Sequence, residues 1–171
     1  MHNPFRLGAT FLLLAALAAC SPDYNWRQVQ NNDASFAALF PGKPASHTQE
    51  INLDGIRTSM SMTAAEVNGV LFAIGSAQLS SPALVQPALQ AMKTAMVRNI
   101  GGAVASDKTV PGPPPFNDVV ADGSRNGRPV RLSARFAARG QRVYQAVVIG
   151  ARQDVPDEAI ETFLDAFKPG G

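Results

Sequence analysis

The sequence predicts an α+β domain in which an antiparallel β-sheet of about six to seven strands is packed by two helices. Strand-like runs flank the dipeptides Asp54-Gly55, Asn68-Gly69 and Asn126-Gly127. Such dipeptides are the strongest short hairpin signals, because both central residues of a type I′ turn adopt positive φ. One helical apolar stripe separates two sets of strands, and a second stripe ends the chain.

The strand-like segments form two groups with a similar pattern. A short strand over 24–30 and an apolar segment over 36–44, which ends in a Pro-Gly turn, come before the first group. Because each group contains a hairpin signal, we expect neighbouring strands to pair antiparallel. The first group comprises 47–53, 56–67 and 70–79, a further strand is expected at 103–110, and the second group comprises 118–125, 128–137 and 142–151.

Two helices are expected to pack on this sheet. Ser81 fits the N-cap and Pro82 the first helical position of the first helix, which ends at Gly101. The last helix begins at Pro156 and carries acidic residues in its first turn, where they complement the helix dipole. The expected apolar stripes are Val85, Leu89, Met92, Met96 and Ile100 in the first helix, and Ile160, Phe163, Leu164 and Phe167 in the last.

The N-terminal residues have the pattern of a secretory signal peptide. Arg6 is followed by an apolar run over 7–17 and by small residues before Cys20. A membrane-spanning helix would need about 20 apolar residues, and this run is shorter. We therefore expect a cleaved signal peptide at 1–19, a lipidated tether at 20–23 and a single domain at 24–171.

The segment Leu17-Ala-Ala-Cys20 resembles the lipobox of bacterial lipoproteins. The resemblance implies cleavage before Cys20, a diacylglycerol thioether on its sulfur and usually an acylated new terminus, which together make a stable membrane anchor. Ser21 stands where lipoproteins retained in the inner membrane typically have aspartate, so the resemblance favours the outer membrane and a domain facing the periplasm. A tether of this length reaches about 10 to 15 Å, which places the domain close to the membrane.

Two stretches resemble uncharacterised bacterial lipoproteins and secreted proteins with a PsbP/Mog-like fold. One is Phe36 to Pro44, with its Phe-Pro-Gly-Lys-Pro, and the other runs from Arg142-Val-Tyr-Gln-Ala-Val-Val-Ile-Gly into Ile160-Glu-Thr-Phe-Leu-Asp-Ala-Phe-Lys. Ala166 replaces the serine of the similar proteins. The resemblance implies an α/β/α sandwich, and since the fold serves unrelated functions, it carries over no catalytic residue.

The residue types needed for most enzyme mechanisms are scarce. His47 is the only histidine after the signal peptide, so a Ser-His-Asp mechanism or a His-rich metal site would depend on it alone. The sequence has no phosphate loop and no nucleophile elbow. We expect no enzyme activity, no cofactor and no metal. The near balance of 15 basic and 13 acidic residues argues against nucleic acid as a partner.

Six of the 11 arginines fall between Arg125 and Arg142. Strand alternation places Arg131 and Arg135 on the opposite sheet face from Leu132 and Phe136, which predicts a basic stripe. Guanidinium groups suit carboxylate and phosphate. The alternative is a solvated strand face whose arginines discourage edge pairing or bridge to acids on a helix. The candidate residues for binding an anion or a partner are Arg128, Arg131, Arg135 and Arg142.

The expected function is a non-catalytic binding or structural role in the cell envelope. The leading form is binding of an envelope protein partner, which an exposed apolar patch would favour. The alternative is binding of anionic phospholipid or a small anion by the arginine hairpin, where each side chain near a bilayer gains about 1 kcal/mol. An enzyme would need a deep pocket that joins His47 to a carboxylate.

Overall fold

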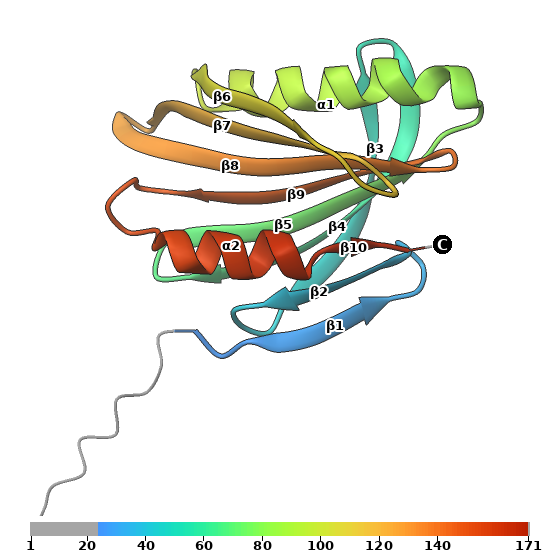
Figure 1. The fold of residues 1–171 in the computed structure, drawn as a ribbon. Helices are drawn as coiled ribbons and strands as arrows, with labels where there is room; N and C mark the ends of the chain where they lie inside the picture. The colour runs from blue at the N-terminus through green and yellow to red at the C-terminus, as the bar shows by residue number, and fades with distance from the viewer. Residues whose placement is uncertain (1–23, 171) are drawn as a thin grey trace, which may run out of the picture.

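A computed structural model describes residues 24–170, and Figure 1 shows their arrangement. The predicted signal peptide, Cys20 and the tether lie outside the described residues. In chain order the elements are β1 (Arg27–Asn31), β2 (Phe36–Phe40), β3 (Ala45–Leu53), β4 (Ile56–Val67), β5 (Val70–Gln78), the 3₁₀ helix η1 (Pro82–Leu84), α1 (Val85–Asn99), β6 (Ala103–Val110), β7 (Phe116–Arg125), β8 (Arg128–Arg139), β9 (Arg142–Gly150), α2 (Asp157–Ala166) and β10 (Lys168–Pro169).

The predicted α+β class is confirmed. Seven strands form an antiparallel sheet in the order β3-β4-β5-β9-β8-β7-β6, and β1, β2 and β10 form a small second sheet. The three expected hairpin turns are present, and Asp54, Asn68 and Asn126 have φ values of 51°, 52° and 51°. Each is followed by a glycine with positive φ, as a two-residue hairpin turn requires.

The large sheet separates two hydrophobic cores. On one face α1 packs against β8 and β9, with Met92 and Leu132 buried between them. On the other face α2 and the small sheet cover the same strands (Figure 1), with Phe40 and Phe163 at the centre of the second core. The successive residues of β9 are therefore buried on both faces, which explains the continuous apolar run of that strand.

The first helix begins later than predicted. Ser81 does act as an N-cap, since its hydroxyl accepts a hydrogen bond from the Ala83 N–H at 3.2 Å, but this cap belongs to η1. The α-helix starts at Val85. The reason is Pro87, which has no N–H: in a helix starting at Pro82 it would leave a backbone bond unmade, whereas in the first turn of α1 it leaves none.

Three further expectations need correction. The first strand begins at Arg27 rather than at residue 24, and β10 at Lys168–Pro169 was not predicted. Leu89 and Met96, placed on the buried stripe of the first helix, are only half-buried. That helix packs mainly against the middle strands β8 and β9, so the flanks of its apolar stripe stay partly open.

Candidate functional site

The arginines of β8 lie on the predicted face but do not form an unpaired basic stripe. Leu132 and Phe136 belong to the core under α1, so the intervening Arg131 and Arg135 point to the α2 side. The antiparallel register of β7 and β8 places Asp122 opposite Arg131 and Asp118 opposite Arg135. Each cation therefore faces a carboxylate on the neighbouring strand, which the sequence-based prediction of a free stripe did not include.

Arg135 is a bridge between the large sheet and α2. Its Nε and Nη2 donate to the two carboxylate oxygens of Asp118 at 2.8 Å, and its Nη1 donates to the Leu164 carbonyl at 2.8 Å and to Asp165 at 3.2 Å. Its guanidinium carbon also lies 4.8 Å from the centroid of the Phe116 ring. Only 11% of its side chain is exposed. The hydrogen bond to Asp118 is the main reason that the pKa of Arg135 is raised.

Arg131 is paired on one side only. Its Nε and Nη2 donate to the Asp122 carboxylate, each at 2.8 Å, which leaves Nη1 without a hydrogen bond in the described part of the chain. The hydrogen bond from Arg131 lowers the pKa of Asp122. This carboxylate therefore remains ionised to lower pH than an isolated one, and the ion pair persists wherever the pH stays above that lowered pKa.

Two more arginines of the hairpin tie the large sheet to neighbouring backbone. Arg142 donates from Nη1 to the Ser76 hydroxyl at 3.2 Å and to the Asp33 carbonyl at 3.3 Å. Arg139 donates to the Pro169 carbonyl at 3.3 Å. These contacts join β9 and β8 to the small sheet and its loops. Arg142, a candidate binding residue, thus has a clear structural role.

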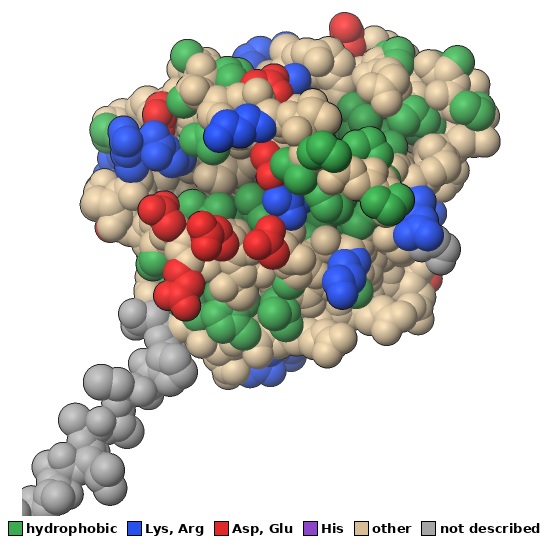
Figure 2. Space-filling model, in the orientation of Figure 1, with side chains coloured by type: hydrophobic (Ala, Val, Ile, Leu, Met, Phe, Trp, Pro, Cys, Tyr) green, Lys and Arg blue, Asp and Glu red, His purple; other side chains and the backbone are tan. Residues whose placement is uncertain are grey.

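Three exposed arginines lie together at one end of the sheet, which we call the arginine end. Arg125 and Arg128 are opposite each other at the β7–β8 turn. Arg131 pairs with Gly150, so continuing the β8–β9 register brings Arg152 to the same end. Among the described residues, Arg125, Arg128 and Arg152 have no hydrogen-bonding or ion-pair partner. Figure 2 shows basic side chains gathered at the left edge of the molecule, beside the β7–β8 turn.

The chain enters the fold at the same end. The rings of Tyr24 and Trp26, close to the start of the described chain, lie 6.0 and 6.2 Å from the ring of Phe72. Phe72 pairs with Val148, two residues before the end of β9. The described chain therefore begins at the end of the large sheet where the β9–α2 loop carries Arg152.

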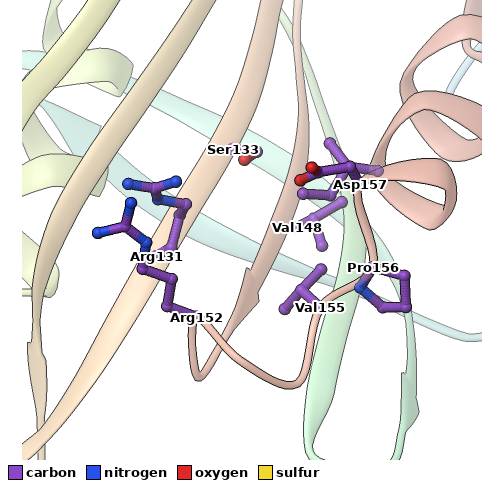
Figure 3. A pocket seen from close by; sticks show the side chains of 8 residues that line it. Arg131, Ser133, Val148, Arg152, Val155, Pro156 and Asp157 are labelled. Atoms are coloured by element: carbon purple, nitrogen blue, oxygen red, sulfur yellow. The ribbon is translucent and has the colours of Figure 1, made fainter.

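A hollow of about 400 Å³ opens at the arginine end between β8, β9 and the start of α2. In Figure 3 the guanidinium groups of Arg131 and Arg152 lie side by side on one flank, the Asp157 carboxylate lies on the other, and the Ser133 hydroxyl lies between them. The lining residues are Arg131, Ser133, Val148, Arg152, Val155, Pro156, Asp157 and Ile160.

Sequence reasoning found only one polar residue of this hollow, Arg131. It assigned Asp157 to the helix dipole and gave no role to Ser133 or Arg152. These residues come from β8, the β9–α2 loop and α2, so no local spacing connects them. Alternation does place Ser133 on the same face as Arg131 and Arg135, but it could not show that α2 begins beside them.

His47, on which any histidine mechanism would depend, lies exposed on the edge strand β3, opposite Met62. It does not line the hollow at the arginine end. Within residues 24–170, no three or more His, Cys, Asp or Glu side chains are grouped as metal ligands. The same residues contain no helix that is long and apolar enough to cross a membrane.

No family model matches the chain, and no curated protein matches it. Its structure is similar to that of PA94, a protein of unknown function from Pseudomonas aeruginosa, with a TM-score of 0.42 and 13% sequence identity over 77% of this chain and 86% of that one. A likeness this distant supports no inference about family or function. The resemblance to PsbP/Mog-like lipoproteins therefore remains a prediction.

Proposed function

We propose that the protein is a lipid-anchored, non-catalytic binding protein of the bacterial envelope, and that its domain rests with the arginine end against anionic phospholipid headgroups. One observation carries the proposal: the exposed arginines and the point where the chain enters the fold share one end of the large sheet. Lipid on Cys20, as the lipobox resemblance implies, would hold that end close to the bilayer. The outer membrane, with the domain facing the periplasm, is the proposed location.

The lipid anchor would hold the domain at the membrane, and the arginines would determine which side of the domain faces the lipid. The anchor keeps the domain at the surface without fixing which side faces the lipid. Each arginine near an anionic surface contributes about 1 kcal/mol. Arg125, Arg128 and Arg152 together would favour one orientation by about a hundredfold. Acidic residues on α2 lie beside this end, and they would disfavour turning that helix to the lipid.

Binding of an envelope protein partner is the second candidate. The large hydrophobic side chains that are exposed in the described residues are Val104 and Val110, 48% and 36% exposed. Both lie on the edge strand β6, which could receive a partner strand. They stand near opposite ends of that strand, so this pair of side chains does not make a continuous apolar patch. The geometry therefore favours headgroups over a protein.

The anchor itself predicts a specific covalent state. Cys20→Ala is expected to abolish incorporation of labelled palmitate and to leave residues 1–19 uncut, because the thioether forms on this sulfur before cleavage. Intact-protein mass spectrometry of membrane fractions measures both changes. Ser21→Ala, which keeps the cysteine, is the control and should stay labelled and cut. An unlabelled natural protein, or one cut at another residue, would refute the anchor.

Charge reversal tests the proposed orientation. The lipidated protein is placed in vesicles with and without anionic lipid, and hydrogen exchange is measured at the turn between Arg125 and Arg128. We expect anionic lipid to slow this exchange, and high salt to restore it because salt screens the attraction. The combined change Arg125→Glu, Arg128→Glu, Arg152→Glu should reduce the protected fraction by more than about tenfold, since it replaces three attractive charges with repulsive ones.

A matched variant controls for net charge. Arg57→Glu, Lys108→Glu, Lys168→Glu makes the same change in charge at exposed positions away from the arginine end, and it should keep most of the protection. Equal protection in both variants would rule out this orientation. Crosslinking in cells would then test the protein-partner mode.

A further inference from the structure

We propose that the hollow at the arginine end binds a small zwitterion, with an anionic group beside Arg131 and Arg152 and an ammonium group at Asp157. This site is separate from the exposed arginines at the β7–β8 turn, because it lies between β8, β9 and α2. It shares Arg152 with the arginine end, whereas Ser133 and Asp157 belong to the hollow alone, so replacing Asp157 tests the hollow without removing an arginine from the arginine end.

Ser133 is the first reason to infer a polar ligand. Only 5% of this residue is exposed, it lines the hollow, and its hydroxyl has no hydrogen-bonding partner within residues 24–170. No polar side-chain atom of the described residues is both fully buried and without a hydrogen bond, so the Ser133 hydroxyl reaches the open space of the hollow, where a ligand can contact it. In Figure 3 the hydroxyl lies between the arginine flank and the Asp157 carboxylate. It is thus placed to donate to, or accept from, a ligand that spans the two flanks.

The arginine flank is suited to an anionic group. Arg131 keeps Nη1 available after its two bonds to Asp122, and Arg152 has no hydrogen bond or ion pair within residues 24–170, although its charge attracts the Asp122 carboxylate. The two guanidinium groups lie side by side (Figure 3) and both attract the Asp122 carboxylate, so one negative charge faces two positive charges on this flank. A phosphate or carboxylate would complete the pairing, because guanidinium groups bind such anions through two parallel hydrogen bonds.

The opposite flank excludes a simple anion. Asp157 lies in the first turn of α2 and has no hydrogen bond or ion pair in the described part of the chain, yet its carboxylate faces the hollow. It would repel a bare phosphate and attract an ammonium group. Val148, Val155 and Ile160 supply apolar wall that suits a short hydrocarbon linker between the two charges.

Phosphoethanolamine has this chemistry, and it could come from a free solute or from a phospholipid headgroup. Titration calorimetry with the lipidated mature protein in maltoside detergent, which carries no charge, would compare O-phosphoethanolamine, inorganic phosphate and ethanolamine as probes. We expect phosphoethanolamine to bind one per chain and at least about tenfold more tightly than either fragment, because only it engages both flanks.

Variants assign the binding to the hollow. Asp157→Asn and Arg152→Ala should each weaken phosphoethanolamine binding by about tenfold, which is the scale of one lost charge-assisted contact. Their controls are Glu158→Gln, in the same helical turn but outside the hollow, and Arg57→Ala, an exposed arginine of β4 that does not line the hollow. Both controls should bind normally. Ser133→Ala should weaken binding less, because its hydroxyl carries no charge.

The results that overturn the proposal are distinct. The site is not a zwitterion site if phosphate alone binds as tightly as phosphoethanolamine, if Asp157→Asn has no effect, or if no probe binds.

Hydrogen exchange at residues 152–157 in lipid vesicles distinguishes a phospholipid headgroup from a free solute as the source of the ligand. Protection only by ethanolamine-headgroup lipid indicates the headgroup, and protection only by added phosphoethanolamine indicates a solute. Protection by neither contradicts the site.

Discussion

Replacement of Phe163 by alanine is expected to lower the free energy of unfolding by about 4 kcal/mol. Phe163 is fully buried and lies 5.4 Å, centroid to centroid, from both Phe40 of β2 and Phe72 of β5, with near-perpendicular rings. One side chain thus joins α2, the small sheet and the large sheet. Removing it would leave a cavity that these three elements can fill only partly, so the transfer and cavity costs add.

Denaturant unfolding followed by circular dichroism measures this loss. Ile160→Ala, a half-buried position on the same helix, is the control and should cost clearly less. A loss below about 1.5 kcal/mol for Phe163→Ala would mean that α2 does not share a core with the two sheets. The slope of the free energy of unfolding against denaturant concentration should stay unchanged if both cores still unfold together.

Hairpins were the part of the fold that local sequence predicted best. The expected range 56–67 matches β4, which lies between the turns at Asp54-Gly55 and Asn68-Gly69. A two-residue turn with positive φ at both positions determines the register of its flanking strands, so the sequence around the turn is enough to predict the hairpin.

The small second sheet could not be predicted in this way. Its strand β10 consists of Lys168–Pro169, which pair with Ala37 and Phe36 at the other end of the chain. Two residues have no periodicity to detect. Their pairing depends on where the end of α2 lies relative to β2, and that position follows from tertiary packing around Phe163 rather than from local sequence.

The ion pairs between β8 and β7 could have been predicted, and they were missed. The alternative named only a bridge from the arginines to acids on a helix, which Arg135 does make to Asp165 of α2. The turn at Asn126-Gly127 pairs Arg125 with Arg128, and counting outward from it places Asp122 opposite Arg131 and Asp118 opposite Arg135. Face alternation alone assigned the arginines to one side without considering the facing strand. By contrast, no count along the sequence would have brought Arg152 and Asp157 to the same hollow.

Arg135→Ala is expected to destabilise the protein by about 2 to 3 kcal/mol, although its charge looked from the sequence like a surface feature. The change would remove both hydrogen bonds to Asp118, the hydrogen bond to the Leu164 carbonyl and the contact with the Phe116 ring. Asp118 would then keep a partly buried charge without its partner, which costs more than the ion pair contributes when intact.

A double replacement separates the cost of the lost Arg135 contacts from the cost of leaving Asp118 unpaired. Urea unfolding of each variant measures the free energy of unfolding. If the cost comes mainly from the unpaired carboxylate, Arg135→Met combined with Asp118→Leu should recover most of the stability that Arg135→Ala loses, because apolar groups of similar volume need no partner. Arg131→Ala is the control, since its partner Asp122 is 44% exposed and water can solvate the remaining charge. A loss from Arg131→Ala as large as that from Arg135→Ala would show that the bridge to α2 adds nothing, and that both arginines act through β7 alone.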